Sequence, residues 1–373
     1  MAAVVLALDS FKSSIDAADA VEALREGWVS VDPGRELTLL PMADGGEGTL
    51  EAFAAAVPDA VRMPVTVTGP EGRRVAASWL LLPPAPGTPD GTAVVELAST
   101  SGIELLGSPP RLRPLDAGTR GFGEAIAAAL AHGVSRLVLG IGSSASTDGG
   151  IGMLTALGAR FTDAASGPIT TGGRGLRSLA AADLSGLPPL PAGGVTVLTD
   201  VTNPLRGDRG AAAVFGPQKG AGQDEIALLD AGLGRLANLV DVDPDTPGAG
   251  AAGGTGFGLL AWGAGLVPGA DAVAELIGLP EAVAAASVVV TGEGSFDGQS
   301  AAGKAPDLVR ALARDAGVPV VLVAGRIAAD ADASGFAHAI SLTALAGSGA
   351  AALAEPARWL FAAGAELARR FPA

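Results

Sequence analysis

The sequence contains no cysteine and no tyrosine, and only two histidines, His132 and His338. Without cysteine the chain has no disulfide, no thiolate nucleophile, no zinc–thiolate site and no iron–sulfur cluster. The two histidines are far apart in the sequence, so a histidine-based metal site or catalytic triad has little support. We expect both to be structural, because His132 ends a predicted helix at Gly133 and His338 precedes a predicted strand.

Aromatic residues are also scarce, at 4%, whereas 49% of positions are hydrophobic. This composition is typical of an α/β enzyme with cores of alanine, valine and leucine, and a length of 373 residues favours two domains. The net charge of −15 argues against binding to nucleic acid or anionic membranes, so we expect a small-molecule partner. No apolar run is long enough to cross a membrane and no basic leader begins the chain, which predicts a cytoplasmic protein.

The two ends of the sequence follow a strand–loop–helix rhythm. Val4–Leu8 and Leu37–Leu40 are short aliphatic runs, and each precedes a helical pattern, at Ala17–Trp28 and Leu50–Ala56. Such units predict a parallel sheet with its site at the carboxyl ends of the strands. The rhythm returns from Ser287 onward, so we expect a discontinuous first domain with the middle of the chain inserted into it.

The middle of the chain has a different texture. Val65–Thr68 and Val75–Leu82 flank the turn sequence Gly69–Gly72, which predicts an antiparallel hairpin. A strand, a long helix and two further strands follow, at Ala93–Leu97, Thr119–His132, Leu137–Gly140 and Val195–Thr199. This part of the chain is therefore expected to contain a mixed sheet.

Six loops next to these strands combine glycine with polar or acidic residues. Glycine lets backbone N–H groups approach phosphate oxygens, and carboxylates hold Mg²⁺ or accept a proton, so together they favour phosphoryl transfer. The loops begin at Asp9, Pro41, Gly140, Asp200, Gly248 and Gly292. Each also has a plain structural interpretation, as a helix cap, an Asx-turn or a packing turn.

Two of these loops resemble nucleotide-binding motifs without matching them. Gly248–Gly258 contains GxGxxG but follows no strand, so we favour a mobile loop that closes over nucleotide, or a plain connection, over a Rossmann fingerprint. Gly298–Lys304 matches a P-loop until Ala305, where a hydroxyl is required. Phosphate binding by Lys304 at a helix terminus is the better interpretation.

Taken together, the motifs resemble the type I glycerate kinase family. The strings that carry the resemblance are DSFK at 9–12, PMADGGEGT at 41–49, GSSASTDGG at 142–150, TDVTNPL at 199–205, VFGPQKGA at 214–221 and TGEGSFDGQSAAGKAP at 291–306. They span nearly the whole chain in family order. The pattern departs from the family at Ser13, at Ser146 and Thr147, at Ser295 and Phe296, and at Arg206, which leaves affinity and substrate range open.

The resemblance implies an α/β fold of two domains, in which a flavodoxin-like parallel-sheet domain is interrupted by a second α/β domain with a mixed sheet. We expect residues 1–62 and 286–373 in the first, 63–285 in the second, and the active site in the cleft between them. The implied reaction is ATP- and Mg²⁺-dependent phosphorylation of D-glycerate to 2-phosphoglycerate. The 3-phosphate, a related hydroxy acid and a non-catalytic binding role stay open as alternatives. So does the oligomeric state, a homodimer included.

Within this scheme each candidate residue has a hypothetical role. Asp200 is the base that accepts the hydroxyl proton, and Lys12 supplies catalytic positive charge. Ser10, Arg120 and Asn203 bind the substrate, since a guanidinium suits a carboxylate. The nucleotide phosphates are assigned to Gly45, Gly46, Ser143, Ser144 and Lys304. The metal is assigned to Asp44, Asp297, Glu47 and Glu293, because Mg²⁺ prefers carboxylate oxygens.

Overall fold

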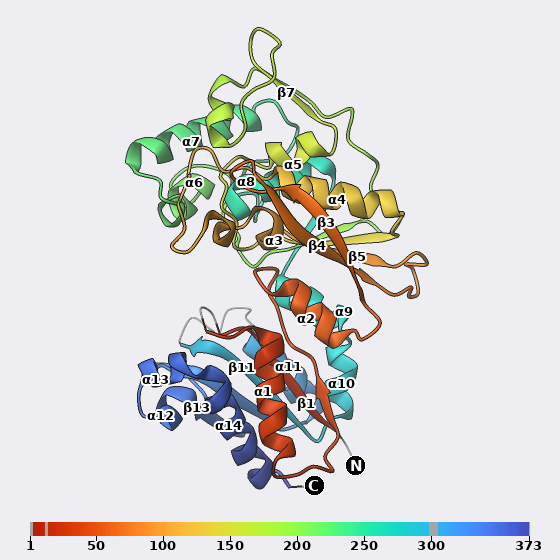
Figure 1. The fold of residues 1–373 in the computed structure, drawn as a ribbon, viewed down its shortest axis with the longest axis vertical. Coiled ribbons are helices and arrows are strands. Elements are labelled where there is room, and N and C mark those ends of the chain that lie inside the picture. Colours follow the sequence, from red (N-terminus) through yellow and green to blue (C-terminus); the bar gives the residue numbers. More distant parts are fainter. Residues whose placement is uncertain (1–2, 12–13, 298–304, 373) are drawn as a thin grey trace. The chain divides into compact units, whose positions relative to one another are not determined.

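The computed structural model describes residues 3–11, 14–297 and 305–372. The chain forms two compact units, each with its own sheet (Figure 1). Unit 1 contains Met1–Asp44, Glu51–Pro58 and Ala270–Ala373, and unit 2 contains Gly45–Leu50 and Asp59–Gly269. Residues 45–50 therefore belong to unit 2, although the segments on both sides of them belong to unit 1.

Unit 1 is built on a five-stranded sheet with strand order β13-β12-β11-β1-β2. The strands are β1 (Val4–Leu8), β2 (Leu37–Leu39), β11 (Val288–Phe296), β12 (Val320–Ile327) and β13 (His338–Ser341). All neighbours pair in parallel. Numbered along this unit alone, the order is 2-1-3-4-5, the flavodoxin-like arrangement. The predicted parallel sheet is confirmed.

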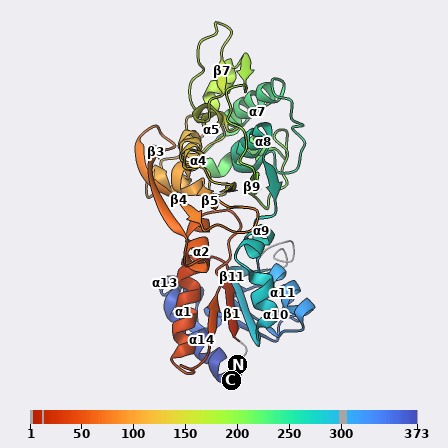
Figure 2. The ribbon, with the colours of Figure 1, turned by 90° about the vertical axis from the view of Figure 1, so that its right-hand side faces the viewer.

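Helices cover both faces of this sheet. The helices that belong wholly or partly to unit 1 are α1 (Ala17–Val29), α2 (Thr49–Ala56), α9 (Gly269–Leu276), α10 (Leu279–Ala285), α11 (Ala305–Ala316), α12 (Leu342–Ala346), α13 (Gly349–Ala354) and α14 (Pro356–Arg370). Figure 2 shows β1 and β11 between α1 and α14 on one side and α10 and α11 on the other. The five residues of β1 are all buried, as a strand covered on both faces requires.

Two glycines let α1 and α14 pack closely. A Cβ added at Gly364 would lie 2.1 Å from the Leu24 carbonyl oxygen, and one at Gly27 would lie 2.0 Å from the Phe361 carbonyl oxygen. Each helix therefore approaches the backbone of the other at a position without a side chain. Around this crossing Trp28 and Leu360 are fully buried and help to form the core of unit 1.

Unit 2 contains a six-stranded sheet with strand order β10-β9-β6-β5-β4-β3. The strands are β3 (Val61–Thr68), β4 (Arg74–Leu82), β5 (Thr92–Glu96), β6 (Arg136–Gly140), β9 (Val195–Leu198) and β10 (Gly265–Val267). β4 pairs antiparallel with both β3 and β5, whereas the pairs β5–β6, β6–β9 and β9–β10 are parallel. The predicted hairpin and mixed sheet are therefore confirmed. A small separate sheet pairs β7 (Arg160–Thr162) with β8 (Ala181–Asp183).

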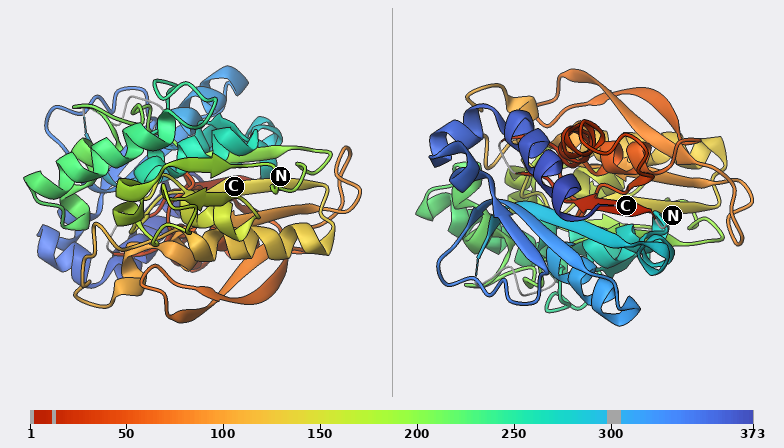
Figure 3. Two further views of the ribbon diagram at one scale, coloured as in Figure 1. Left: turned by 90° about the horizontal axis from the view of Figure 1, so that it is seen from above. Right: turned by 90° about the horizontal axis from the view of Figure 1, so that it is seen from below.

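The helices of unit 2 complete a single large core. They are α3 (Ala98–Ser101), α4 (Arg120–His132), α5 (Ile151–Ala156), α6 (Ala211–Phe215), α7 (Gln223–Ala237) and α8 (Ala251–Trp262), with short 3₁₀ turns η1 (Ile103–Leu106), η2 (Gly173–Ser178) and η3 (Pro217–Lys219). Figure 3 shows α4, in yellow, running along the sheet. As expected, α4 ends at His132, and Gly133 follows with φ 91°, a left-handed C-cap.

Two segments expected to be loops are regular structure. β11 continues to Phe296, so Glu293 lies within a strand: pairing with β12 overrides the turn-forming residues, and a Cβ at Gly292 would lie 1.9 Å from the Val323 carbonyl oxygen. Gly248–Gly258 is buried along most of its length, and from Ala251 it is part of α8, with a left-handed kink at Ala252, Gly253 and Gly254. Its glycines permit close packing, since a Cβ at Gly253 would lie 2.1 Å from the Ser146 carbonyl oxygen.

No helix in residues 3–11, 14–297 and 305–372 combines the length and apolar character needed to cross a membrane.

Candidate active site

In unit 2 the glycine loop Gly45–Thr49 packs against the carboxyl ends of β6 and β9. The Gly142 N–H donates to the Gly45 carbonyl oxygen at 2.9 Å. A Cβ at Gly142 would lie 2.5 Å from the Gly46 Cα, and one at Gly45, whose φ is 92°, would lie 2.6 Å from the Leu198 Cβ. Only glycine fits this contact, which brings two predicted phosphate-binding residues, Gly45 and Gly46, against the loop that follows β6.

The same loop leads into α2 through a cap that the sequence did not reveal. Thr49, fully buried, donates its hydroxyl to the Gly46 carbonyl oxygen at 2.7 Å. The Leu50 N–H at the start of α2 donates to Glu96 Oε2 at 3.0 Å. Glu96, the last residue of β5, is buried, so its carboxylate fixes the helix start to the sheet of unit 2.

Glu47, at the exposed tip of this loop, lies near a second acid, Glu104 of η1. Partial burial raises the pKa of Glu47, and the charge and hydrogen bonding of Glu104 raise it further. Two carboxylates that repel each other in this way favour the binding of a cation or a shared proton. The assignment of Glu47 to a metal stays a prediction.

The loop after β6 is held at its start by backbone pairing with Ser101–Ile103. The Ile103 N–H donates to the Ser143 carbonyl oxygen at 3.0 Å, and the Ala145 N–H donates to the Ser101 carbonyl oxygen at 3.1 Å. Ser143 is exposed and has a left-handed φ of 56°, which is rare for serine. Loop residues held in this conformation are a common feature of ligand sites.

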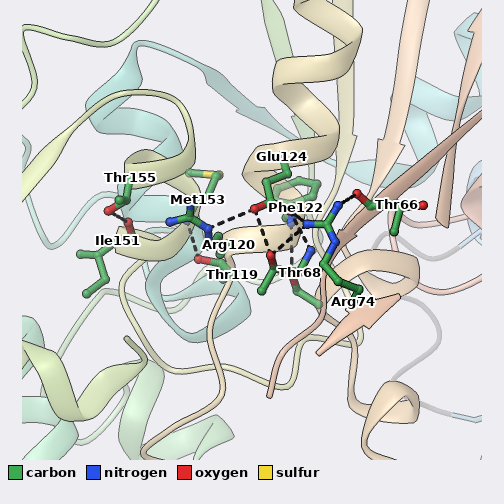
Figure 4. A network of polar contacts seen from close by, with 11 residues as sticks. Thr66, Thr68, Arg74, Thr119, Arg120, Phe122, Glu124, Ile151, Met153 and Thr155 are labelled. Carbon is green, nitrogen blue, oxygen red and sulfur yellow. Dashed lines mark hydrogen bonds and ion pairs between the residues drawn. The ribbon is translucent and has the colours of Figure 1, made fainter. Parts of the chain in front are cut away.

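Further along the same loop, the carboxylate of Asp148 is fully buried. It accepts hydrogen bonds from the Thr119 N–H at 3.0 Å, the Thr119 hydroxyl at 2.9 Å, and the N–H groups of Gly150 and Gly152 at 3.0 and 3.3 Å. Burial raises the pKa of Asp148, and these hydrogen bonds oppose the shift. The Thr119 hydroxyl also accepts from the Met153 N–H, visible in Figure 4, so Asp148 ties the loop to the start of α4.

Lys219, the last residue of η3, contacts the same loop although it lies 75 residues from Ser144 in the sequence. Its Nζ donates to Ser144 Oγ at 2.8 Å and to the Ser146 carbonyl oxygen at 2.5 Å. Burial lowers the pKa of Lys219 to about 7, while the charge of Asp148 opposes that shift. Lys219 and Asp148 both occur in motifs that carry the family resemblance, but no composition or spacing signal identified them as a buried charge pair.

Arg120, predicted to bind substrate, is the first residue of α4 and is held in a polar network (Figure 4). Its Nε donates to Glu124 Oε1 at 3.0 Å, and Glu124 also accepts from the Thr68 N–H and from Arg74. The Arg120 side chain remains about half exposed, at 48%. Its guanidinium therefore has further N–H donors at the surface of the unit for a carboxylate ligand.

Asp200 and Asn203 lie in the loop after β9, the strand next to β6. Asp200 is exposed, and its Oδ1 accepts from the Gly269 N–H at the start of α9 at 2.8 Å. The Asn203 side-chain amide donates to the Arg209 carbonyl oxygen at 2.8 Å, and the backbone carbonyl oxygen of Asn203 accepts from the Gly250 N–H. The structure thus fixes both residues, within unit 2, beside the loop that carries Ser143 and Ser144.

In unit 1 the remaining candidate acids lie after β2 and within or after β11, the strands on either side of β1. The Asp9 N–H donates to the Gly292 carbonyl oxygen at 2.9 Å, which places Ser10 beside the part of β11 that carries Glu293. Asp44 follows β2, and Asp297 follows β11. Within the described ranges no three acids or histidines form a group that could hold a metal ion. Lys12 and Lys304 are outside the described residues.

Known proteins resemble this chain along almost its whole length. Residues 4–372 match the model of the glycerate kinase family. The chain is 43% identical over 338 residues to a protein of Bacillus subtilis named glycerate kinase, covering 88% of this chain and 86% of that protein. It is also 43% identical over 336 residues to glycerate 2-kinase of Escherichia coli, with the same coverage.

A solved structure agrees with these sequence matches. The crystal structure of putative glycerate kinase 2 from Salmonella typhimurium LT2 superposes with a TM-score of 0.84 at 39% identity, covering 99% of this chain and 98% of that one. The two-sheet α/β architecture described above is thus shared with a protein of that description. The sequence and fold together show that the chain belongs to the glycerate kinase family.

Proposed function

We propose that the protein transfers the γ-phosphoryl group of ATP to the C2 hydroxyl of D-glycerate, giving 2-phosphoglycerate and ADP. The observation that carries this is the 43% identity, over 88% of the chain, to proteins named glycerate kinase and glycerate 2-kinase. The second of these names supports the 2-position. Family membership accounts for the kinase class, and the printed names supply the acceptor.

The loops of unit 2 suit the binding of anions. Gly45 and Gly46 pack against the backbone of the loop that carries Ser143 and Ser144, and loops rich in N–H and hydroxyl groups bind phosphate oxygens. Arg120, with its exposed guanidinium, suits the glycerate carboxylate. The hydrogen bonds of Asn203 to Arg209 and Gly250 hold the loop that carries Asp200. We therefore retain these residues as the substrate and phosphate contacts.

We retain Asp200 as the base that accepts the proton of the glycerate hydroxyl. Its carboxylate is exposed in the loop after β9, and the hydrogen bond from the Gly269 N–H helps to orient it. In the proposal, positive charge comes from Lys12 and, at the nucleotide phosphates, from Lys304. The Ser10 hydroxyl contacts the substrate. In a phosphoryl transfer most of the catalysis comes from such positioning and charge.

We retain Asp44, Asp297, Glu293 and Glu47 as candidate ligands for Mg²⁺. Carboxylates are hard oxygen ligands, and Mg²⁺ usually takes one or two of them together with phosphate oxygens and water. When bound, the ion neutralises charge on the β- and γ-phosphates.

Proton-coupled ³¹P NMR of the product tests the proposal. In 2-phosphoglycerate the phosphorus couples to one carbon-bound proton and gives a doublet, whereas in 3-phosphoglycerate it couples to two and gives a triplet. We expect a doublet from D-glycerate and ATP, with no product when either is omitted. A triplet would overturn the 2-position, and release of inorganic phosphate alone would overturn the acceptor.

The same reaction tests Asp200. We expect Asp200→Asn to lower kcat by about 10²–10⁴-fold, the usual contribution of a general base, without changing the Mg²⁺ concentration needed for half-maximal rate. A variant of a metal ligand would shift that concentration. A near-wild-type kcat for Asp200→Asn would show that another group accepts the proton.

A further inference from the structure

The side chain of Lys219 is an isolated basic group inside unit 2. The sequence has three lysines, Lys12, Lys219 and Lys304, and Lys219 is the only one among the described residues. It is 2% exposed, at the end of η3, where Gly220 turns the chain with a φ of 89°. An arginine at such a site would stay charged, whereas a lysine can lose its proton.

Stability alone does not account for this residue. Placing a charged pair in the core removes both groups from water, and the attraction between them often fails to compensate for that loss. Here the desolvation is visible in the lowered pKa of Lys219 and the raised pKa of Asp148. Among the described residues, Asp148 is the only titratable group whose charge acts on that of Lys219.

The contact with Ser144 defines what the lysine does to the loop. While Nζ is an ammonium it can only donate, so Ser144 Oγ must accept from it. The single hydrogen of the Ser144 hydroxyl then points elsewhere. Ser144 is 8% exposed and directly follows the exposed Ser143, so the residue lies just beneath the loop surface.

We propose that Lys219 is a positioning residue for the anion held by the loop Gly142–Gly150, because its ammonium compels the Ser144 hydroxyl to donate toward an anionic oxygen of the substrate. The proposal rests on the function proposed above. The anion is a phosphate of the nucleotide or the carboxylate of glycerate, two sources of the same oxyanion chemistry. Lys219 itself is too deeply buried to contact either one.

Loss of the lysine's proton reverses the contact. A neutral amine carries a lone pair, so Ser144 can donate its hydrogen to Nζ and the loop loses a donor. Affinity for the anion is therefore high while Lys219 is charged and falls as pH rises through its pKa of about 7. A carboxylate such as that of glycerate titrates far below this range, near pH ~3.5, and adds nothing to the change.

The test compares KM for ATP and KM for glycerate between about pH 6 and pH 9 in the wild type, Lys219→Met and Ser144→Ala. We expect Ser144→Ala to raise one of the two KM values about tenfold at low pH, the usual effect of one hydrogen bond to a charged ligand, and to match the wild type at high pH. Lys219→Met should abolish the pH dependence of the same KM, because no amine remains to accept the Ser144 hydrogen. Whichever substrate shows the effect is the one that binds this loop.

A purely structural lysine would give a different result. Its replacement would lower stability or kcat, and the ratio of the variant's KM to the wild-type KM would be the same at low and high pH. That outcome overturns the proposal, as does a wild-type KM for Ser144→Ala at low pH or a pH dependence of KM that persists in Lys219→Met. Should Lys219→Met fail to fold, Ser144→Ala, a smaller change, still decides the question through the same pH comparison.

Calorimetric titration with ATP or glycerate separates this inference from the proposed reaction. If the wild type makes no phosphoglycerate, the reaction is wrong, but a binding constant that weakens with pH only when both Lys219 and Ser144 are present still supports the positioning role. If neither ligand binds more weakly at high pH, the positioning role is wrong even in an active kinase.

Discussion

At the scale of single residues, the buried Lys219 makes a prediction about stability that is independent of substrate. Burial lowers its pKa from 10.5 to about 7, so between these values the unfolded chain binds more protons than the folded one. The free energy of unfolding should therefore rise with pH from about 7 to about 10, by up to ~1.4 kcal/mol per unit, and level off below about 7, where both states bind the proton. Urea unfolding at several pH values measures this slope.

Lys219→Met should remove the slope. The test is clean because the sequence has no cysteine and no tyrosine, the other side chains that titrate in this range. A slope that survives the substitution would assign the effect to the remaining lysines or the amino terminus. Asp148 acts on the acid side: burial raises its folded pKa, so the stability it contributes is complete below the unfolded value and is lost as pH rises through the folded one.

At the scale of elements, the glycine loop at Gly45 allows a matched comparison. Gly45 and Gly48 both have a left-handed φ, 92° and 85°, but only Gly45 lacks room for a Cβ. We expect Gly48→Ala to cost about 1 kcal/mol of unfolding free energy, the backbone cost alone, and Gly45→Ala about 1–3 kcal/mol more because Leu198 must move. Equal costs, measured by urea unfolding, would show that the loop relaxes freely.

The crossing of α1 and α14 gives a second comparison at this scale. Gly364→Ala places a Cβ 2.1 Å from the Leu24 carbonyl oxygen, so we expect a net loss of about 1–2 kcal/mol after the gain in helix propensity. Gly349→Ala, at the start of α13, meets only Thr343 Oγ1 at 3.9 Å and should be neutral or stabilising by up to ~1 kcal/mol. Thermal unfolding of the two variants checks the order.

The elements show where sequence reasoning succeeds. Periodicity located β1, α1, the β3–β4 hairpin and α4 because each has an uninterrupted apolar pattern. It failed at β11, where Gly292 lets two strand backbones pack closely, and at α8, where Gly253 combines a left-handed kink with a close approach to Ser146. A single sequence does not distinguish a glycine needed for a turn from one needed for a close approach.

At the scale of the whole molecule, the candidate site shows the same limit. The loops that carry Gly45, Ser143 and Asp200 were found because glycine and acid follow strands. The buried groups that hold them, Glu96, Asp148 and Lys219, were not, because burial of a charged side chain depends on contacts between residues far apart in the sequence. Asp148 and Lys219 lie in motifs that carry the family resemblance, but the resemblance did not assign a role to either residue.

The net charge of −15 makes the last prediction, which concerns the whole chain. Excess like charge destabilises a compact state through self-repulsion, and salt screens it, since the Debye length falls from about 30 Å at 0.01 M to about 10 Å at 0.1 M. We expect the urea midpoint at about pH 8 to rise when KCl is increased over this range.

Near the isoelectric point, about 4.5, the net charge approaches zero and the effect should disappear. Measuring at about pH 5 therefore provides the control within the same protein. A salt effect of equal size at both pH values would point to ion binding at a particular site rather than to screening of the net charge. The acidic loops at Asp44 and Glu47 would be the first place to look for it, through the Asp44→Asn and Glu47→Gln variants.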